Sequence, residues 1–354
     1  MPLKQPVFLT KLLHSEHWPA YLYYFPLIPY YIFSALQLRN LTFYLAANPS
    51  IKYSGNGSES KYKTLQLIPK KHIPKTILAP KNSAFSEIIK ELEQAGITFP
   101  IIAKPDIGFR GLLVRKIHNK QKLQEFLKKN NINLILQEYI DYPNECGIFF
   151  VKIPGEPTGK ITSITLKKFI SVTGNGTDNL KDLILNHQRA CIYKKIFFKL
   201  HTDNLNKIIK KGQMIKLTDI GNHSKGTTFI NGNHLIEDKL TRTFNAIAKE
   251  IPQWHYGRID LKYHSWEALQ DGKDFKIIEL NGIIAEPTHI YDTKKGSYFA
   301  SLKSILTHWR WLKKIAVKNH KINKTNYPKT KPYIADMLAL RKYSKNLVRL
   351  HHNE

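Results

Sequence analysis

Two strand-like runs near the end of the chain face each other across a polar turn. Residues 258–263 and 275–281 alternate between apolar and polar side chains, and the Asp-Gly-Lys-Asp stretch between them has the composition of a hairpin turn. Residues two apart in a strand share a face, so Glu279 and Asn281 lie on one face of the second strand. If the strands pair, Asp260 joins them and two carboxylates meet an amide oxygen.

Oxygen atoms of this kind suit Mg²⁺, which keeps several waters and binds through one or two carboxylates together with substrate phosphates. Arg258 stands two residues before Asp260, so it shares that face and adds a cation to it. An exposed polar face of an antiparallel hairpin would have the same pattern. The stretch therefore predicts either a magnesium–phosphate site or a solvated hairpin, and the rest of the chain must decide between them.

The size and cysteine content limit the class of protein. A chain of 354 residues with 42% hydrophobic residues can build two or three compact domains. The two cysteines, Cys146 and Cys191, are too few for a disulfide framework and are not spaced as metal ligands. With no secretory signal pattern at the start, we expect a cytoplasmic protein in a reducing compartment, either free or associated with a membrane.

The net charge of +28 favours anionic partners, namely nucleotide phosphates, nucleic acid or an acidic membrane surface. Much of this charge lies outside the regions that look like a site. Residues 310–354 hold twelve Lys and Arg against two acids. We interpret this run as a solvated basic tail.

Residues 18–38 carry no charge and contain seven tyrosines and phenylalanines. Their length suits a membrane span of about 20 residues. However, Pro26 and Pro29 would each cost about 3 kcal/mol inside a helix, and Tyr and Trp prefer the membrane interface to its centre. We therefore expect two short helices, broken at residues 26–29, that either pack on the protein or lie in a membrane interface.

The next segment has a layout that is common at anion-binding sites. Residues 41–47 are expected to form a strand and residues 54–58 a Gly/Ser loop. A short helix opened by Glu59-Ser60-Lys61 is expected to run to Leu67. The loop has neither Walker lysine spacing nor a G-x-G-x-x-G pattern. A simple connecting loop explains the segment equally well.

Residues 99–105 are expected to form an apolar strand that carries one lysine, Lys104. A glycine-bearing loop follows at residues 106–111, and the strand resumes at 112–114. Glycines let backbone N–H groups approach phosphate oxygens closely, although an ordinary hairpin would look similar. A lysine at the end of an apolar strand is costly to bury without a partner, which favours a ligand role for Lys104.

Hydrophobic periodicity predicts the remaining elements. Further strands are expected at residues 134–140, 146–151, 161–169, 216–222 and 227–230. Helices are expected at residues 83–95 with Ser83 or Ser86 as cap, 120–129, from a Thr177 or Asp178 cap to 186, 190–210, 236–251, 297–318 and 334–351.

Taken in order, the motifs at residues 99–145, 167–184 and 221–281 resemble the ATP-grasp superfamily. The likeness is strongest to its carboxylate–amine ligases, such as D-alanine–D-alanine ligase, with loops similar to the cyanophycin-synthetase type, and it covers roughly residues 75–300. It implies an α+β fold in which two α+β subdomains clasp ATP beside a smaller N-terminal α/β region. The implied division is an N-terminal region 1–75, a small subdomain 76–140, a large subdomain 141–310 and a basic helical tail 311–354.

The resemblance also implies nucleotide-binding roles. Lys104 would bind phosphate and act in catalysis, under a loop made by Gly108, Arg110 and Gly111. The linker Gln137, Glu138 and Ile140 would hold the adenine edge, and Glu145 would bind the ribose hydroxyls. Lys167 or Lys168 would be a second phosphate ligand, with Lys167 also catalytic.

For the metal and the chemistry, the resemblance implies that Asp260, Glu279 and Asn281 hold Mg²⁺. Arg258 would stabilise the oxyanion of a tetrahedral intermediate. The implied activity is ATP-dependent joining of a carboxylate to an amine through an acyl phosphate, with release of ADP and phosphate. Both steps gather negative charge, which Mg²⁺, lysine and arginine stabilise.

The chain departs from the dipeptide ligases in two places. Phe109 and Arg110 stand where those enzymes carry serines in the glycine loop. After the Glu-x-Asn those enzymes have a threonine and a Pro-Gly turn that help to bind an amino-acid carboxylate, whereas residues 282–288 here read Gly-Ile-Ile-Ala-Glu-Pro-Thr. We therefore expect another acid or another nucleophile. Candidates for holding the amine are Glu286, His289 and Asp292, each of which has an equally simple structural explanation.

One alternative belongs to a different class of function. A catalytically idle nucleotide fold could bind an anionic membrane surface or nucleic acid, the latter being the less favoured partner. Binding to a phosphate backbone would fall steeply with salt, whereas ATP turnover would depend on Mg²⁺. The sequence leaves the two substrates and the oligomeric state open.

Overall fold

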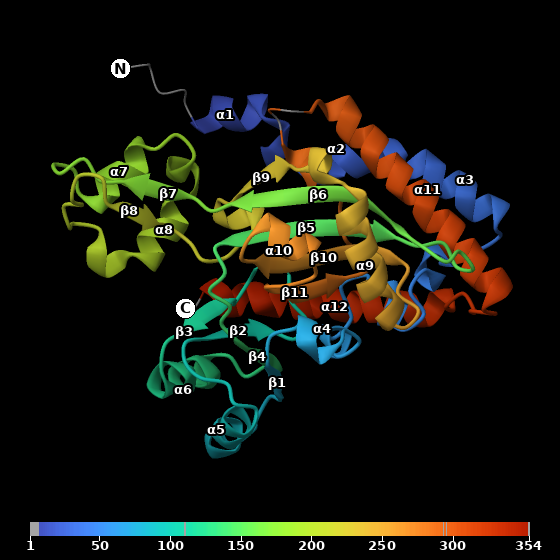
Figure 1. The fold of residues 1–354 in the computed structure, drawn as a ribbon, viewed down its shortest axis with the longest axis horizontal. Coiled ribbons are helices and arrows are strands. Elements are labelled where there is room, and N and C mark those ends of the chain that lie inside the picture. Colours follow the sequence, from blue (N-terminus) through green and yellow to red (C-terminus); the bar gives the residue numbers. More distant parts are fainter. Residues whose placement is uncertain (1–6, 110, 293, 295, 353–354) are drawn as a thin grey trace.

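The computed structural model describes residues 7–109, 111–292, 294 and 296–352. The fold is α+β, as expected from the sequence, with two main antiparallel sheets and helices on their outer faces (Figure 1). The large sheet occupies the centre of Figure 1, and the small sheet lies below it with two helices at the bottom of the view. Most of the site residues predicted from the sequence lie between these two sheets.

The large sheet has five strands in the order β11-β10-β5-β6-β9, each antiparallel to its neighbours. Their bounds are β5 Asn144–Val151, β6 Lys160–Lys168, β9 Thr228–Asn231, β10 Tyr256–Tyr263 and β11 Phe275–Asn281. β10 and β11 pair as the alternation predicts, with Asp260 opposite Glu279 and Arg258 opposite Asn281. The predicted polar turn between them is wrong in one respect, because it contains a helix, α10 (Trp266–Gln270), which begins at the Ser265 cap and buries Leu269.

Both faces of the large sheet are covered, because the central strand β5 alternates its side chains between them. Ile148 and Phe150 pack toward α9 (Asp238–Glu250) and α10 on one face. Phe149 and Tyr256 pack toward α11 (Tyr298–Ile322) and the 3₁₀ helix η3 (Phe43–Ala46) on the other. The second face is apolar only at one end, and its other end carries the charged residues of the candidate site.

The small sheet has four strands in the order β1-β4-β2-β3, and its core packs on two helices. The bounds are β1 Thr76–Ala79, β2 Ile101–Pro105, β3 Arg115–Ile117, β4 Leu134–Glu138, α5 Phe85–Gln94 and α6 Lys120–Lys129. The expected strand at 112–114 is wrong, because Leu113 has a φ of +54° and is buried in a turn before β3 begins. The expected serine cap of α5 is also wrong: Ala84 occupies the N-cap position and has no side-chain hydrogen bond there.

A separate lobe on the left of Figure 1 contains residues 170–217. Its bounds are β7 Ser171–Thr173, α7 Leu180–Asn186, η6 Ala190–Tyr193, α8 Lys194–Leu200, η7 Thr202–Asn204 and β8 Met214–Lys216. The single helix expected at 190–210 is wrong, because Leu180 N–H donates to Lys207 O and draws that part of the chain against the start of α7. Asn179, rather than Thr177 or Asp178, caps α7, and the strand expected at 216–222 ends at Lys216.

The N-terminal region is helical, with α1 Val7–Leu13, η1 Ser15–His17, α2 Tyr21–Tyr24, η2 Phe25–Leu27 and α3 Ile28–Gln37. The expected break near the prolines falls at η2. The inner side of these helices packs on the protein through Tyr23, Leu27 and Ala35, and their outer side leaves Phe25, Phe33 and Leu36 largely exposed. No helix in the described part of the chain is long and apolar enough to span a bilayer.

The strand expected at 41–47 is wrong, and the structure has η3 there instead. Phe43, Leu45 and Ala46 are all buried, which strand alternation would not allow on a single covered face. The carbonyls of Ala46 and Ala47 accept hydrogen bonds from the Asn319 side chain on α11, at 3.0 and 2.8 Å. The side chain of Asn319 on α11 therefore makes the hydrogen bonds to these carbonyls that a neighbouring strand would otherwise make.

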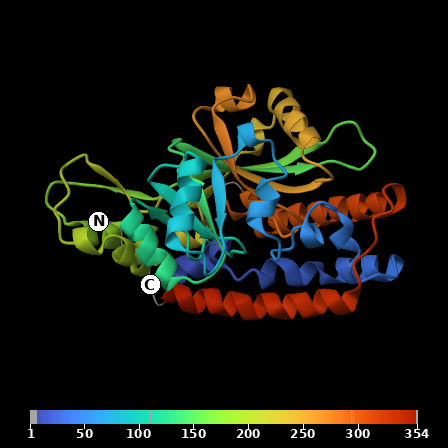
Figure 2. The ribbon, with the colours of Figure 1, turned by 90° about the horizontal axis from the view of Figure 1, so that it is seen from below.

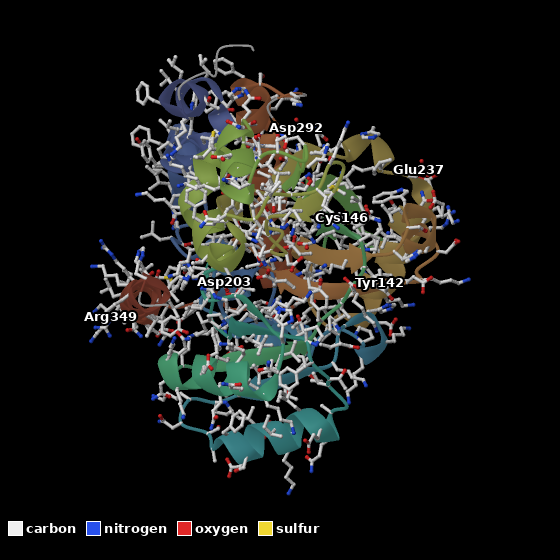
Figure 3. All side chains as sticks on the ribbon, turned by 90° about the vertical axis from the view of Figure 1, so that its left-hand side faces the viewer. Tyr142, Cys146, Asp203, Glu237, Asp292 and Arg349 are labelled. Atoms are coloured by element: carbon white, nitrogen blue, oxygen red, sulfur yellow. The ribbon has the colours of Figure 1, made fainter. Side chains whose placement is uncertain are left out.

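The basic C-terminal segment is part of the fold and not a solvated tail. The expected boundary at 310/311 falls inside α11, and α12 (Thr330–His352) runs the length of the molecule beside the N-terminal helices (Figure 2). Arg349 on α12 points outward, whereas Cys146 lies in the interior (Figure 3). Leu347 is fully buried in the core of the small sheet. The helix thus presents its charges to solvent and one apolar row to the protein.

The other short helices complete the chain: η4 Lys52–Ser54, α4 Lys61–Leu65, η5 Lys70–His72, η8 His223–Lys225, η9 Asn233–Leu235 and η10 Thr288–Tyr291. Of these, α4 matches the short helix expected after the Gly/Ser loop.

If α12 is docked as described, Leu347→Ala should lower the free energy of unfolding by about 2–5 kcal/mol, because it leaves a cavity in a closed core. The matched control is Leu338→Ala on the same helix, where the leucine is 62% exposed, and we expect little change there. Urea denaturation of the whole chain measures both values. Equal stability of the two variants would contradict the docking.

Candidate active site

The charged end of the large sheet brings predicted residues from four strands onto one face. Directly opposite residues in an antiparallel pair share a face. Asp260 lies opposite Glu279 on one side and Gly147 on the other, and Glu145 lies opposite Lys167. The register alone therefore places the site, before any side-chain contact is considered.

Asp260 is the centre of this cluster and is almost fully buried. Arg258 donates to both of its carboxylate oxygens, with Nε and Nη2 at 2.9–3.2 Å, and Lys167 Nζ lies 3.0 Å from Oδ1. Asn281 Nδ2 donates to Oδ2 at 2.9 Å. Burial alone would raise the pKa of Asp260, but the charges of Arg258 and Lys167 lower it to about 2. The carboxylate is therefore ionised at neutral pH.

Glycine at position 147 makes room for this arrangement. A Cβ atom there would lie 2.9 Å from Arg258 Cδ and 3.1 Å from Asp260 Oδ1. Any other residue would push the guanidinium away from the carboxylate. Gly221 has a similar function nearby, because its backbone packs so closely on the Glu145 carboxylate that a side chain would overlap it.

Lys167 rather than Lys168 enters the site. Lys167 Nζ lies 2.7 Å from Glu145 Oε1, and its side chain is almost fully buried. Burial alone would lower the pKa of Lys167, but Asp260 and Glu145 together raise it, so the ammonium stays charged. Lys168 is exposed because the strand alternation turns it to the opposite face.

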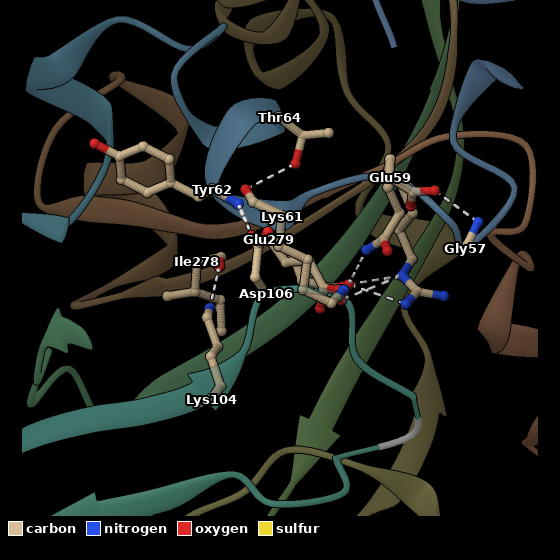
Figure 4. A network of polar contacts seen from close by, with 12 residues as sticks. Gly57, Glu59, Lys61, Tyr62, Thr64, Lys104, Asp106, Ile278 and Glu279 are labelled. Atoms are coloured by element: carbon tan, nitrogen blue, oxygen red, sulfur yellow. Dashed lines mark hydrogen bonds and ion pairs between the residues drawn. The ribbon is translucent and has the colours of Figure 1, made fainter. Parts of the chain in front are cut away.

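Glu279 pairs with a residue that the sequence analysis missed, Lys61, at the start of α4 (Figure 4). The Asp106 side chain holds this turn, because its Oδ1 accepts from Ser60 Oγ at 2.8 Å and from Tyr62 N–H at 2.9 Å. The Gly/Ser loop before Lys61 was the available signal. Its layout is common at anion-binding sites, but no pattern in the sequence distinguishes the lysine that follows it from other lysines.

Lys104 reaches the same region from β2 in the small sheet (Figure 4). Its Nζ donates to Gln137 Oε1 at 3.1 Å and to the backbone oxygen of Ile278 at 3.0 Å. Burial lowers the pKa of Lys104 to about 8, with the neighbouring Lys61 acting in the same direction and Glu279 opposing it. The Lys104 ammonium group therefore loses its proton more readily than an ordinary lysine, and a bound anion would stabilise the charged form.

These residues border a cleft of about 1320 Å³ between the two sheets. Of the predicted site residues that the structure describes, all line this cleft except Lys168, His289 and Asp292. Arg110 lies outside the described residues. Glu16 and Trp18 from the N-terminal region also line the cleft, which the sequence analysis did not predict.

The linker at the end of β4 borders the cleft with Gln137, Glu138 and Ile140. Glu138 Oε2 accepts from the backbone N–H of Lys75 at 3.1 Å, so its carboxylate is held near the strand β1. Gly111 in the glycine loop also borders the cleft, has a φ of +74° and lies against Asn222. A glycine loop and a hydrogen-bonded strand end therefore both border the cleft.

The three residues proposed from the sequence for the amine lie in different surroundings. Glu286 lines the cleft. His289 Nδ1 is 2.6 Å from Ser163 Oγ, and Asp292 Oδ2 accepts from the backbone N–H of Asn231 at 2.8 Å. Burial lowers the pKa of His289 to about 4, so its ring is neutral. His289 and Asp292 therefore join η10 to the strands β6 and β9 and do not reach the cleft.

The protein side chains in the cleft supply only some of the ligands that a Mg²⁺ ion needs. Among the described residues, no group of three or more His, Cys, Asp or Glu side chains could hold a metal ion. Asp260 and Glu279 nevertheless lie opposite each other beside the amide of Asn281. Two carboxylates and one amide suit a magnesium ion that takes its remaining ligands from water and phosphate oxygens.

The comparison with family models identifies the domain. Residues 58–179 match the RimK-like ATP-grasp domain. The chain contains an ATP-grasp domain. The matched range begins just before Lys61 and includes Lys104, the glycine loop and Lys167, which all border the cleft. The ATP-grasp fold expected from the sequence is therefore confirmed.

Solved structures with ATP-grasp folds are more distant. The D-Ala:D-Ser ligase VanG from Enterococcus faecalis is 14% identical with a TM-score of 0.42, and 75% of this chain covers 63% of that one. The bifunctional glutathione synthetase from Pasteurella multocida is 15% identical with a TM-score of 0.38, and 72% of this chain covers 38% of that one. The chain thus spans less than two thirds of either protein. No curated protein matches the sequence.

The depressed pKa of Lys104 predicts how nucleotide binding by the ATP-grasp domain depends on pH. The ammonium is present below the pKa of about 8 and is lost as the pH rises through it. The affinity for Mg²⁺-ATP should fall several-fold as the pH rises from about 7 to about 9.5. In Lys104→Arg the guanidinium stays protonated, so this slope should flatten. Calorimetric titration measures both profiles, and an unchanged slope in the variant would refute the assignment.

Proposed function

We propose that this protein is an ATP-dependent ligase that joins a carboxylate to an amine through an acyl phosphate. The observation that carries the proposal is the meeting of Lys61, Lys104 and Lys167 with the carboxylates Asp260 and Glu279 inside one large cleft. A solvated hairpin would leave these groups exposed, whereas Asp260 is 2% exposed.

Each of the three lysines at the centre of the cleft is paired with a protein group that a bound nucleotide would replace. Lys61 pairs with Glu279, Lys167 with Asp260 and Glu145, and Lys104 with neutral oxygens only. Buried charges need partners, and removing one partner leaves an expensive unpaired ion. When phosphates take the lysines, the freed carboxylates need cations in turn. A magnesium ion entering with the phosphates would supply that charge.

The residues that would hold the metal are Asp260, Glu279 and the amide of Asn281. Magnesium would neutralise charge on the phosphates and polarise the phosphoryl group. Glu145 and Lys167, which pair across β5 and β6, would separate when Glu145 binds the ribose and Lys167 a phosphate.

The proposed reaction balances in two steps. A carboxylate oxygen of the acid bonds to the γ-phosphorus of ATP, and the bond to the leaving ADP oxygen breaks. The amine nitrogen then donates its lone pair to the carbonyl carbon, and the carbon–oxygen bond to phosphate breaks, so phosphate leaves with the electron pair. The amine loses its proton to a base or to water.

Arg258 is placed to stabilise the negative oxygen that develops in the second step. Asp260 fixes its Nε and Nη2, and its Nη1 donates to the backbone oxygen of Glu286 at 3.0 Å. A guanidinium held on two sides does not have to reorganise when charge develops, and such preorganisation is where most electrostatic catalysis arises.

The test is phosphate release from Mg²⁺-ATP in the presence of pools of amino acids, small carboxylates and amines. Glu279→Gln removes one metal-binding charge and should lower release by about 10²–10³-fold without unfolding the protein. Glu93→Gln changes the same charge on the exposed surface of α5 and should behave as wild type. Circular dichroism checks that both variants fold.

Near-normal phosphate release by the Glu279→Gln variant would contradict the proposed metal site. Tight ATP binding with no release under any pool would instead favour the alternative, a nucleotide fold kept for binding alone. Release that requires both an acid and an amine would establish the ligase.

A further inference from the structure

A second cavity, of about 480 Å³, lies beside the nucleotide cleft. It is enclosed by α2 and α3, the 3₁₀ helix η3, the helix α11 and the loop that follows β11. Figure 1 shows α2 and α3 running alongside α11 in this part of the molecule. The two hollows have Ala20, Ile284, Ala285 and Glu286 in common, so this loop forms the wall between them.

Aromatic rings dominate the lining of this cavity. Tyr24 stacks on Trp309 with ring centroids 6.1 Å apart and an angle of 18° between the planes. Tyr31 and Tyr44 meet nearby at 5.9 Å. A volume of this size with an apolar lining is typical of sites for organic ligands. The cavity is therefore built to bury an apolar body.

Among the described residues that line the cavity, none is a lysine or an arginine. His308 adds no positive charge, since burial lowers its pKa and both ring nitrogens have partners: Nε2 lies 3.0 Å from Thr162 Oγ1 and Nδ1 lies 2.8 Å from the backbone oxygen of Ser304. A ligand carboxylate would find no counter-charge here. Burying an unpaired carboxylate is costly, so the cavity excludes amino acids as ligands.

Of the described residues that line the cavity, Glu286 is the one that is acidic. Tyr24 Oη donates to its Oε1, and Tyr291 Oη donates to its Oε2 at 2.8 Å. Among the described residues, no lysine or arginine forms an ion pair with this carboxylate; Arg258 donates to its backbone oxygen, and the guanidinium charge acts on the carboxylate at longer range. Burial and the Glu286 charge raise the pKa of Tyr24, so the hydroxyl remains a donor. A partly buried carboxylate is thus held in place by two tyrosine hydroxyls, and no cation among the described residues is in direct contact with it.

We propose that this cavity binds the amine substrate of the ligase, and that this amine carries an aromatic or alkyl body and no carboxylate. Its ammonium group pairs with Glu286, and its body lies among the rings of α2, α3 and α11. Aromatic faces add to the attraction of an ammonium group. The inference names the substrate class of the proposed function and rests on it.

The position of Glu286 suits a nucleophile. The residue is tied to Arg258, which reaches Asp260 on its other side. An ammonium at Glu286 would lie at the border between the apolar cavity and the cleft. The carboxylate can accept the proton that the ammonium loses before its nitrogen attacks the acyl carbon, so the balance of the second step needs no further reactant.

Binding of simple amines tests the proposal without any turnover. The probe is 2-phenylethylamine, with hexylamine as an alkyl counterpart, titrated calorimetrically into the whole chain. Phenylalanine adds a carboxylate to the skeleton of 2-phenylethylamine, and 3-phenylpropionate has a carboxylate in place of the amine. Both amines should bind saturably, and both carboxylates should bind at least tenfold more weakly.

Variants assign the binding to Glu286. Glu286→Gln should weaken 2-phenylethylamine binding at least tenfold while leaving 3-phenylpropan-1-ol, a neutral analogue, unchanged. Glu93→Gln removes the same charge from the exposed surface of α5 and should bind the amine as wild type does. Tyr24→Phe should weaken amine binding less than Glu286→Gln, because it removes one hydrogen bond to the carboxylate and not the charge.

Absence of amine binding, equal binding of phenylalanine, or an unchanged affinity in Glu286→Gln would each overturn the proposal. These outcomes are independent of the phosphate-release assay. Amine binding by a protein that never turns over ATP would refute the ligase function and leave the cavity assignment standing. Turnover with amines that do not compete with 2-phenylethylamine would support the ligase function and refute the cavity assignment.

Discussion

The ion cluster around Asp260 is the constraint on which the rest of the structure depends. A nearly buried carboxylate is tolerated because Arg258, Lys167 and Asn281 all contact it. The three partners come from β10 itself, from β6 and from β11, so the cluster ties together the strands of the large sheet. Breaking one such buried contact would cost about 3–5 kcal/mol, because the remaining charge would be left unpaired. The same dependence makes the cluster sensitive to any ligand that brings charges of its own.

One face of the large sheet is divided into two halves by this cluster. Phe149 and Tyr256 at one end pack under α11, whereas Glu145 and Asp260 at the other end face the cleft. The loop of residues 282–286 follows directly from β11 and runs along the border between these halves. It is held against the N-terminal region, since Ile283 and Ile284 N–H groups donate to Ser54 and Gly55 oxygens, both at 3.0 Å. A polar cleft and an apolar cavity therefore meet at Glu286.

Strand periodicity and local motifs predicted part of the candidate site, and the family resemblance supplied the rest, such as Glu145 and Lys167. The face shared by Asp260, Glu279 and Asn281 follows from alternation and pairing alone, and the lysine of an apolar strand pointed to Lys104. Lys61 could not be placed this way, because its contact with Glu279 joins residues 218 positions apart and depends on how α4 docks. The choice between Lys167 and Lys168 likewise needed the register of β6.

The misassigned elements share a physical cause. Residues 41–47 have strand-forming side chains, but their carbonyls are satisfied by Asn319 from α11 and not by a neighbouring strand. The basic C-terminal segment looked solvated because it holds twelve Lys and Arg against two acids, yet Leu347, together with Tyr343 and Leu350, packs on the small-sheet core. In both cases, contacts with distant parts of the chain overrode the local pattern.

The central claim is that the carboxylates of the cleft exchange their protein cations for a magnesium nucleotide. Calorimetric titration of a non-hydrolysable ATP analogue, in Mg²⁺ and then in a chelator, tests this most directly. The account predicts binding at least tenfold tighter with Mg²⁺, and loss of that difference in Asp260→Asn. Equal affinity of the wild-type chain with and without the metal would contradict it.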